Sequence, residues 1–126
     1  MSSWTPQELD TVDRTDEVHL ASSRPDGTLR PAATIWAVRV GDDVFVRSAY
    51  GPSNGWFRRA QASGSGHLAV GDAELDVTFE PAPDDVHEAV DAAYHAKYDG
   101  RYEASIVGTV VGPEVRDVTL RVVPRD

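Results

Sequence analysis

The feature that most constrains this chain is a succession of short segments in which apolar and polar residues alternate, separated by tight turns. Leu75, Val77 and Phe79 alternate with Asp76 and Thr78. Successive side chains of a β-strand point to opposite faces, so this spacing predicts a strand with one buried face. Comparable segments, joined by turns such as Gly41-Asp42-Asp43 and Pro25-Asp26-Gly27, give six expected antiparallel strands, at 18–23, 29–40, 44–48, 67–71, 75–80 and 119–123.

Helices are expected between these strands. Thr5-Pro6-Gln7-Glu8 is a capping box with proline at the first helical position, which predicts a helix over 6–14. Further helices are expected over 55–62 and 84–98, while 103–115 is predicted to be irregular. Two to three helices among six antiparallel strands make an α+β fold, and closure into a small split β-barrel would remove the exposed sheet edges.

Length and cysteine content narrow the class of protein. The 126 residues suffice for one domain, spanning 1–126, with one modest core. The absence of cysteine excludes disulfides, thiolate metal sites and cysteine nucleophiles, and fits a reducing compartment. No signal peptide is recognisable, and no apolar run approaches the roughly 18 residues that span a membrane. We therefore expect a cytoplasmic protein that does not act at a membrane.

The charge of the chain bears on its partners. A net charge of −9 would repel a phosphate backbone, which argues against nucleic-acid binding. Lys97 is the only lysine among 12 basic residues. Any anion site must therefore use the forked guanidinium groups of arginine, or backbone amides.

The best candidate binding site in the sequence is Val46–Arg59, V-R-S-A-Y-G-P-S-N-G-W-F-R-R. A strand ends here, and a loop rich in Gly, Pro, Ser and Asn leads to a helix start, whose free N–H groups favour an anion. The polar and aromatic side chains available are those of Arg47, Ser48, Tyr50, Ser53, Asn54, Trp56, Arg58 and Arg59. An ordinary strand-to-helix connection with solvated arginines explains the same residues, and both interpretations stay open.

Three other groups of residues are weaker candidates. One helical face carries the stripe His87, Asp91 and His95, which suits metal binding or proton transfer. A solvated helix face is the simpler interpretation of this stripe, and we expect no metal site. The rings of Tyr94, Tyr98 and Tyr102 and of Trp36 are suited to line a pocket, although packing in the core explains them as well.

Several segments carry a family resemblance: R-P-A-A-T-I-W-A-V-R-V-G-D-D-V-F-V-R-S, G-P-S-N-G-W-F, D-A-A-Y-H-A-K-Y and T-L-R-V-V-P-R. They resemble an uncharacterised group of small bacterial proteins, the domain of unknown function 2255. That group is similar to the flavin- and deazaflavin-binding split-barrel proteins, which include pyridoxamine-phosphate oxidases and deazaflavin-dependent reductases. The resemblance implies a six-stranded split barrel, a homodimer, and a cofactor at the subunit interface.

The first functional hypothesis follows from that resemblance. The chain would be an oxidoreductase that binds flavin mononucleotide (FMN) or a deazaflavin and acts on a small molecule. The strand around Trp36 would run along the cofactor ring. The cofactor contacts would come from Trp36, Arg47, Ser48, Ser53, Asn54, Trp56 and Arg59, and the groups facing substrate would be Tyr50, Tyr94 and Tyr98.

Two alternatives use no cofactor. In the first, the same barrel binds a small acidic or aromatic molecule, or transforms it by proton transfer, cyclisation or isomerisation. Arg47 would then hold a carboxylate, while Tyr98, His95 or Asp99 would transfer protons. In the second, the chain is a dimeric interaction module without pocket chemistry.

Overall fold

The computed structural model describes residues 3–49 and 54–125. Within these residues the chain forms seven strands, four α-helices and two short 3-10 helices. In chain order they are α1 (Pro6–Arg14), β1 (Val18–Ser22), β2 (Ala33–Ile35), β3 (Ala37–Val40), β4 (Asp43–Arg47), α2 (Gly55–Ser63), β5 (Ser65–Val70), β6 (Ala73–Pro81), α3 (His87–Tyr98), α4 (Ala104–Val107), η1 (Gly108–Val110), η2 (Pro113–Val118) and β7 (Thr119–Pro124).

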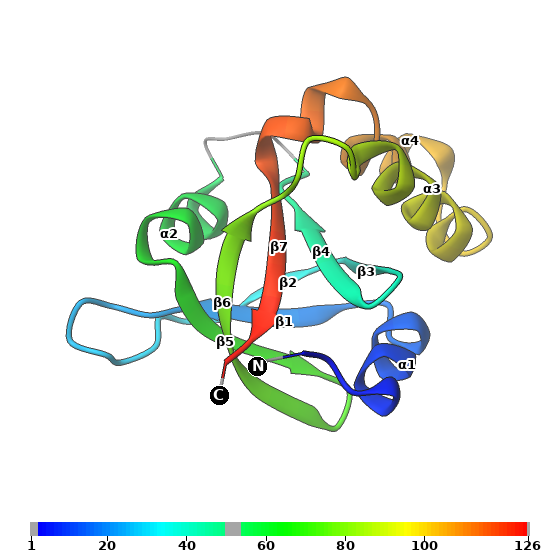
Figure 1. Cartoon of the computed structure of the whole chain (residues 1–126). Helices are drawn as coiled ribbons and strands as arrows, with labels where there is room; N and C mark the ends of the chain where they lie inside the picture. The colour runs from blue at the N-terminus through cyan, green and yellow to red at the C-terminus, as the bar shows by residue number, and fades with distance from the viewer. Residues whose placement is uncertain (1–2, 50–53, 126) are drawn as a thin grey trace.

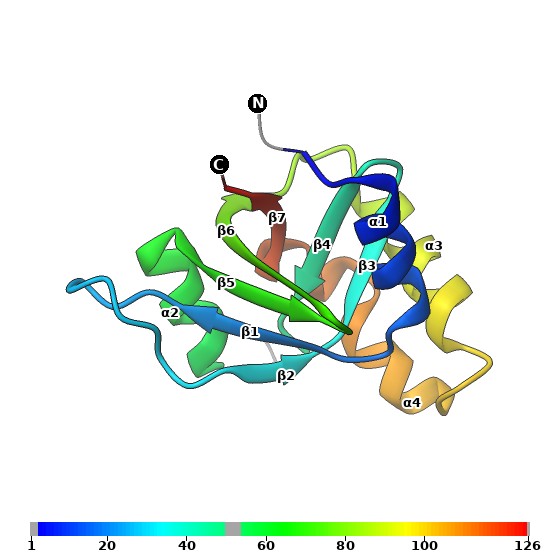
Figure 2. The same cartoon turned by 90° about the horizontal axis from the view of Figure 1, so that it is seen from below.

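All seven strands belong to one antiparallel sheet, in the order β2-β1-β5-β6-β7-β4-β3. The two ends of this order, β2 and β3, are consecutive in the chain and are separated only by Trp36. The sheet therefore curls round until its ends meet, and it forms a nearly closed barrel (Figures 1 and 2). The predicted α+β split barrel is confirmed in this form.

The strand count differs from the prediction of six. A single strand was expected over 29–40, but β2 begins only after Pro31, and the strand is interrupted at Trp36. β2 pairs with β1, whereas β3 pairs with β4, so the chain changes neighbours at Trp36. That change of partner breaks the hydrogen-bonded ladder and makes two strands out of one.

The helices also outnumber the two to three expected. The capping box of α1 is present: Thr5 Oγ1 accepts from the Glu8 amide at 3.1 Å, and Glu8 Oε1 accepts from the Thr5 amide at 2.8 Å. Residues 103–115, predicted to be irregular, instead contain α4, η1 and the start of η2. Each of these has six residues or fewer, which is too short for a helical period to show in the sequence.

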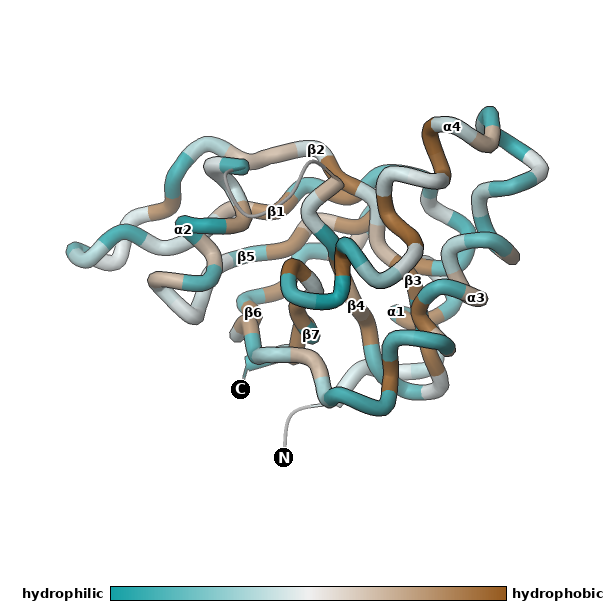
Figure 3. Tube along the Cα trace, turned by 90° about the horizontal axis from the view of Figure 1, so that it is seen from above, coloured by the Kyte–Doolittle hydropathy of each residue, from teal (hydrophilic) through white to brown (hydrophobic). Residues whose placement is uncertain are grey.

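Two apolar cores lie on the two faces of the sheet. Val44 and Val46 of β4 point into the barrel, while Phe45 points outward to α3 and packs with Tyr94 and Tyr98. Strand side chains alternate between faces, so the next outward residue of β4 is Arg47, which also faces α3. In Figure 3 the hydrophobic segments follow the strands, and the hydrophilic ones gather on loops and helix turns.

The helices flank the barrel on different sides. Figures 1 and 2 show α2 on one side and α3 with α4 on the other. The chain's only lysine joins α3 to its neighbours: Lys97 Nζ donates to the Val12 and Ala37 carbonyl oxygens, each at 2.6 Å. Burial lowers the pKa of Lys97 to about 8. Within the described residues, no helix is both long and apolar enough to cross a membrane.

Candidate functional site

A pocket of about 320 Å³ lies where the barrel opens, between β2, the start of α2, and η1. We call it the aromatic pocket, and its principal walls are Thr34, Ile35, Trp36, Arg47, Asn54, Trp56 and Val110. Four of the predicted cofactor-binding residues, Trp36, Arg47, Asn54 and Trp56, are thus brought together. They come from three segments of the chain: Trp36 joins β2 to β3, Arg47 ends β4, and Asn54 and Trp56 lie at the start of α2.

Both tryptophans of the pocket are held in place by other rings. Trp36 stacks on Tyr98, with ring centroids 4.0 Å apart and an interplanar angle of 7°. Trp56 meets Phe57 edge to face at 6.0 Å and is 8% exposed. Because each ring is packed on its inner side, it presents a fixed aromatic surface or edge to the pocket.

The pocket also borders an unpaired strand edge. Among the described residues, β2 pairs only with β1, through registers such as Val18 with Ile35 and His19 with Thr34. The backbone groups on the other edge of β2 therefore have no neighbouring strand. A flat ligand with polar edge atoms could hydrogen-bond there, since each strand residue exposes a donor and an acceptor.

Arg47 lies at the back of the pocket, and its guanidinium is engaged by the protein itself. Its side chain is fully buried and forms an ion pair with Asp91 of α3. It also donates from Nε to Thr119 Oγ1 at 2.9 Å and from Nη1 to the Val110 carbonyl oxygen at 2.8 Å. A further contact of 3.3 Å joins Nη2 to the carbonyl oxygen of His87.

This network sets the electrostatics behind the pocket. The charge of Arg47 is balanced by Asp91, which also accepts from the Gly112 amide at 3.2 Å. Burial, reinforced by the nearby Arg47 cation, lowers the pKa of His87, so this histidine is neutral at pH 7. The arrangement braces β4 against α3 and η1 rather than presenting a free cation to a ligand. The predicted contact between Arg47 and an anion stays a prediction.

The other predicted residues are distributed as follows. Tyr98 is fully buried, and its hydroxyl donates to the Asp16 carbonyl oxygen at 2.6 Å, so it supports Trp36 from behind. His95 is exposed and pairs with Asp99 at 2.9 Å, on a part of α3 that does not line the aromatic pocket. Ser48 is buried at the end of β4.

Arg59 lines a different pocket, on the other side of α2. Tyr50 and Ser53 lie outside the described residues.

The stripe of His87, Asp91 and His95 is divided by the fold. His87 and Asp91 turn towards Arg47, while His95 points to solvent. Within residues 3–49 and 54–125, no three side chains of His, Cys, Asp or Glu come together as a metal site.

Sequence reasoning missed several residues of the aromatic pocket. Ile106, Thr109 and Val110 reach it from α4 and η1, and Glu17 reaches it from the residue before β1. The exposure of Ile106, at 45%, is unusual for a large apolar side chain and is explained by its place at the pocket rim. No local pattern marks these residues, because α4 and η1 are too short to show a period.

The chain resembles known proteins both in sequence and in fold. Residues 8–122 match the family described as an uncharacterised protein conserved in bacteria, DUF2255. A candidate pyridoxamine 5′-phosphate oxidase from Listeria innocua is 12% identical, with a TM-score of 0.63 over 95% of this chain and 92% of that one. The heme storage protein HutZ from Vibrio cholerae is 13% identical, with a TM-score of 0.64 over 96% and 89%.

An F420 reductase is 20% identical, with a TM-score of 0.57 over 91% of this chain and 90% of that one. Among curated proteins, none matches the sequence. At these identities the likeness establishes the fold, which is the split barrel of the pyridoxamine-phosphate-oxidase type.

Proposed function

Since the chain belongs to the DUF2255 family and folds as a split barrel, we propose that it binds the ring of a flavin or deazaflavin cofactor in the aromatic pocket and acts as an oxidoreductase on a small molecule. The observation that supports this most directly is the coincidence of three features in one pocket. These are the fixed rings of Trp36 and Trp56, the unpaired edge of β2, and the amide of Asn54. A flat heteroaromatic ring with polar edges fits all three.

The residues take distinct roles in this proposal. Trp36 and Trp56 contact the ring faces or edges, and the backbone at Thr34 and Ile35 meets its polar atoms. Arg47 is a positioning residue, because it holds Val110 in the pocket wall through the bond to its carbonyl oxygen. A bound flavin or deazaflavin would supply hydride transfer at its central ring.

The remaining predicted residues keep narrower roles. Ser53 and Asn54 are proposed to meet the ribityl or phosphate part of the cofactor, in place of a free Arg47. Ser48 is buried and is proposed to support the end of β4 rather than to touch the cofactor. Tyr50 is proposed to face substrate. Tyr98 is proposed to fix the plane of Trp36 rather than to touch substrate, since its hydroxyl is bonded to backbone.

A second copy of the chain is expected to close the pocket. Ile106 stands 45% exposed at the rim, where a partner surface would bury it. We therefore propose a homodimer, and light scattering at micromolar concentration tests it. A monomer mass would contradict this part of the proposal alone.

The test of function is a titration with FMN and with a deazaflavin, followed by the visible spectrum and by tryptophan fluorescence. We expect binding with Kd below about 100 μM, or roughly 5.5 kcal/mol of binding free energy. Thr34→Glu places a bulky carboxylate on the exposed edge of β2 and should raise Kd at least about tenfold. Gln7→Glu, which makes the same change of charge on the exposed face of α1, is the matched control.

Failure of both cofactors to bind below about 1 mM would contradict the proposal. The cofactor-free alternative would then be the better description of the same pocket. Equal weakening by Thr34→Glu and Gln7→Glu would show instead that binding occurs somewhere other than the aromatic pocket.

A further inference from the structure

We propose that the chain has a second ligand site, a cationic pocket between α2 and the β1–β2 connection, which binds a small molecule carrying two or more carboxylate or phosphate groups. The pocket has a volume of about 770 Å³. It is separate from the aromatic pocket, and its ligand need not be a cofactor. The proposal therefore goes beyond the function proposed above and does not depend on it.

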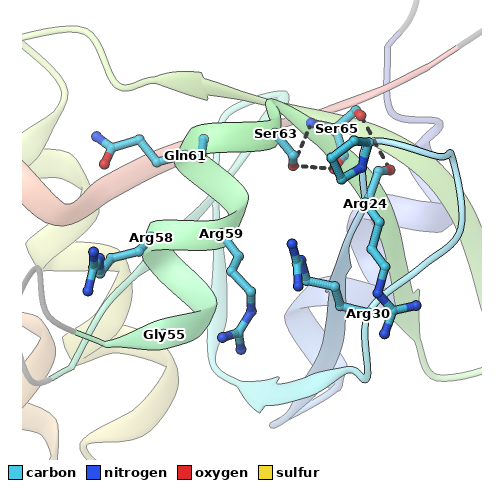
Figure 4. Close-up of a pocket in the computed structure, with 11 residues that line it drawn as sticks. Arg24, Arg30, Gly55, Arg58, Arg59, Gln61, Ser63 and Ser65 are labelled. Carbon is cyan, nitrogen blue, oxygen red and sulfur yellow. Dashed lines mark hydrogen bonds between the residues drawn. The ribbon is translucent and has the colours of Figure 1, made fainter.

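Four arginines make up the cationic pocket. Arg24 and Arg30 come from the connection between β1 and β2, and Arg58 and Arg59 come from α2. The rest of the wall is small or polar, with serines and Gln61, and none of the described lining residues is acidic (Figure 4). A chain with a net charge of −9 has thus gathered four positive charges at one cavity without an acidic side chain among them.

Among the described residues, none of these four guanidinium groups forms an ion pair with an acidic side chain. The Arg24 guanidinium donates instead to two uncharged oxygen atoms, the Leu29 carbonyl oxygen at 2.9 Å and Thr28 Oγ1 at 3.4 Å. Arg24 helps to lower the pKa of the Asp26 carboxyl, but Asp26 does not line the pocket. Guanidinium groups do not deprotonate at neutral pH, so an anion from solution that enters the pocket would relieve their mutual repulsion.

Two of the arginines are directed into the cavity. Figure 4 shows Arg59 and Arg30 extending towards one another across the gap, while Arg58 and Gln61 project from the other side of α2. Arg59 lies against the first residue of its helix: a Cβ added to Gly55 would stand 2.8 Å from Arg59 Nη1. The absence of a side chain at Gly55 therefore makes room for this guanidinium.

The arrangement indicates the chemistry of the ligand. Each guanidinium can donate two parallel hydrogen bonds to one carboxylate or phosphate group. Two such groups facing each other across a cavity favour a ligand with at least two anionic groups, because a single anion would engage one fork well and leave the other cation unbalanced. Serine hydroxyls in the wall, such as Ser63, suit the polar remainder of such a molecule.

Isothermal titration with citrate and with inorganic pyrophosphate tests the proposal, and acetate serves as the monoanion control. We expect at least one of the two polyanions to bind with Kd below about 1 mM at low salt, and more weakly at 150 mM salt, where the Debye length is about 8 Å. Acetate should bind at least about tenfold more weakly. Which polyanion binds decides between a carboxylate and a phosphate ligand.

Matched variants locate the binding. Arg30→Gln and Arg59→Gln should each raise Kd at least about tenfold, whereas Arg14→Gln, which removes the same charge from the exposed face of α1 outside the pocket, should change it by less than about threefold. Gly55→Ala keeps every charge but displaces the Arg59 guanidinium, and it should weaken binding while the fold is retained. Circular dichroism of each variant confirms that it is folded.

The proposal is overturned if neither citrate nor pyrophosphate binds below about 10 mM at low salt. It is also overturned if Arg14→Gln weakens binding as much as Arg59→Gln, because the ligand would then sense only the general charge of the protein. The outcome is distinct from that of the cofactor titration. A protein that binds citrate but not FMN or a deazaflavin would retain the cationic pocket and lose only the proposed oxidoreductase function.

Discussion

The buried ion pair between Arg47 and Asp91 makes the most direct test of the structure. Asp91→Asn is nearly isosteric and keeps an oxygen for the Arg47 and Gly112 donors. Among residues 3–49 and 54–125, it removes the one acidic partner of a guanidinium whose side chain is fully buried. The perturbation is therefore almost purely one of charge, and it leaves a buried cation without compensation.

The expected magnitude follows from the exposure of the two side chains. Removing one partner of a fully buried ion pair costs about 3–5 kcal/mol of the free energy of unfolding. The Asp91 side chain is 25% exposed, so water already screens part of the interaction, and we expect about 2–3 kcal/mol. For a chain of this size that corresponds to a decrease in Tm of about 8–12 °C.

Urea unfolding followed by circular dichroism measures this change in free energy. Asp99→Asn is the matched control, because it removes the same charge from the same part of the chain. Its partner His95 is 51% exposed, so the cost should stay within about 0.5 kcal/mol. If Asp91→Asn were as stable as Asp99→Asn, Arg47 would not be a buried cation balanced by α3, and its assignment as a positioning residue would be wrong.

Three further predictions concern stability. Gly66→Ala would bring a Cβ within 2.0 Å of the Ala21 carbonyl oxygen, between β5 and β1, so it should abolish folding or lower the free energy of unfolding by more than about 3 kcal/mol. A Cβ added at Gly108 meets no atom, so Gly108→Ala should leave the stability unchanged, and thermal unfolding compares the two variants. Burial raises the pKa of Tyr98 above its ordinary value of 10.0, so the native hydroxyl keeps a proton that the unfolded chain loses. The free energy of unfolding should therefore decrease as pH rises above about 10, and less so in Tyr98→Phe, as urea titrations at each pH would show. Thr5→Ala removes the capping box of α1 and should cost about 1 kcal/mol in the same assay; no change would mean that the cap is not formed in solution.

The parts of the fold that could be predicted are those set by residues close together in the sequence. The capping box and the alternation of apolar residues in β6 depend on neighbours a few positions away, and both predictions are confirmed. The break at Trp36 could not be predicted in this way. It arises because the chain leaves β1 for β4 as its hydrogen-bonding neighbour in the middle of a continuous run of strand-forming residues, where no turn residue marks the change.

In the candidate site, too, some features follow from neighbouring residues in the sequence and others arise only from the fold. The segment around Trp56 was predicted to bind a ligand, since a loop rich in turn residues that leads into a helix is recognisable locally. Trp56 does line the aromatic pocket, while its contact with a ligand stays a prediction. Arg47 looked like a free anion ligand for the same reason. Its partner Asp91 lies 44 residues away, on a helix whose placement the sequence does not reveal. The pairing of Arg30 with Arg59 across one cavity is likewise a product of the fold alone.

The opening of the barrel links the two expectations made for this protein, a flat ligand and a second copy of the chain. Within the described residues, β2 and β3 each have one edge without a neighbouring strand. Such edges invite pairing with another chain unless something covers them. The edge of β3 is flanked by α1 and α3, whereas the edge of β2 borders the aromatic pocket. A cofactor ring would cover the edge of β2, whereas a partner subunit would cover Ile106 at the rim of the same pocket, so each would bury surface beside the other, and dimerisation and cofactor binding should strengthen one another. Light scattering with and without FMN measures this coupling, and a dimer fraction that FMN leaves unchanged would separate the two.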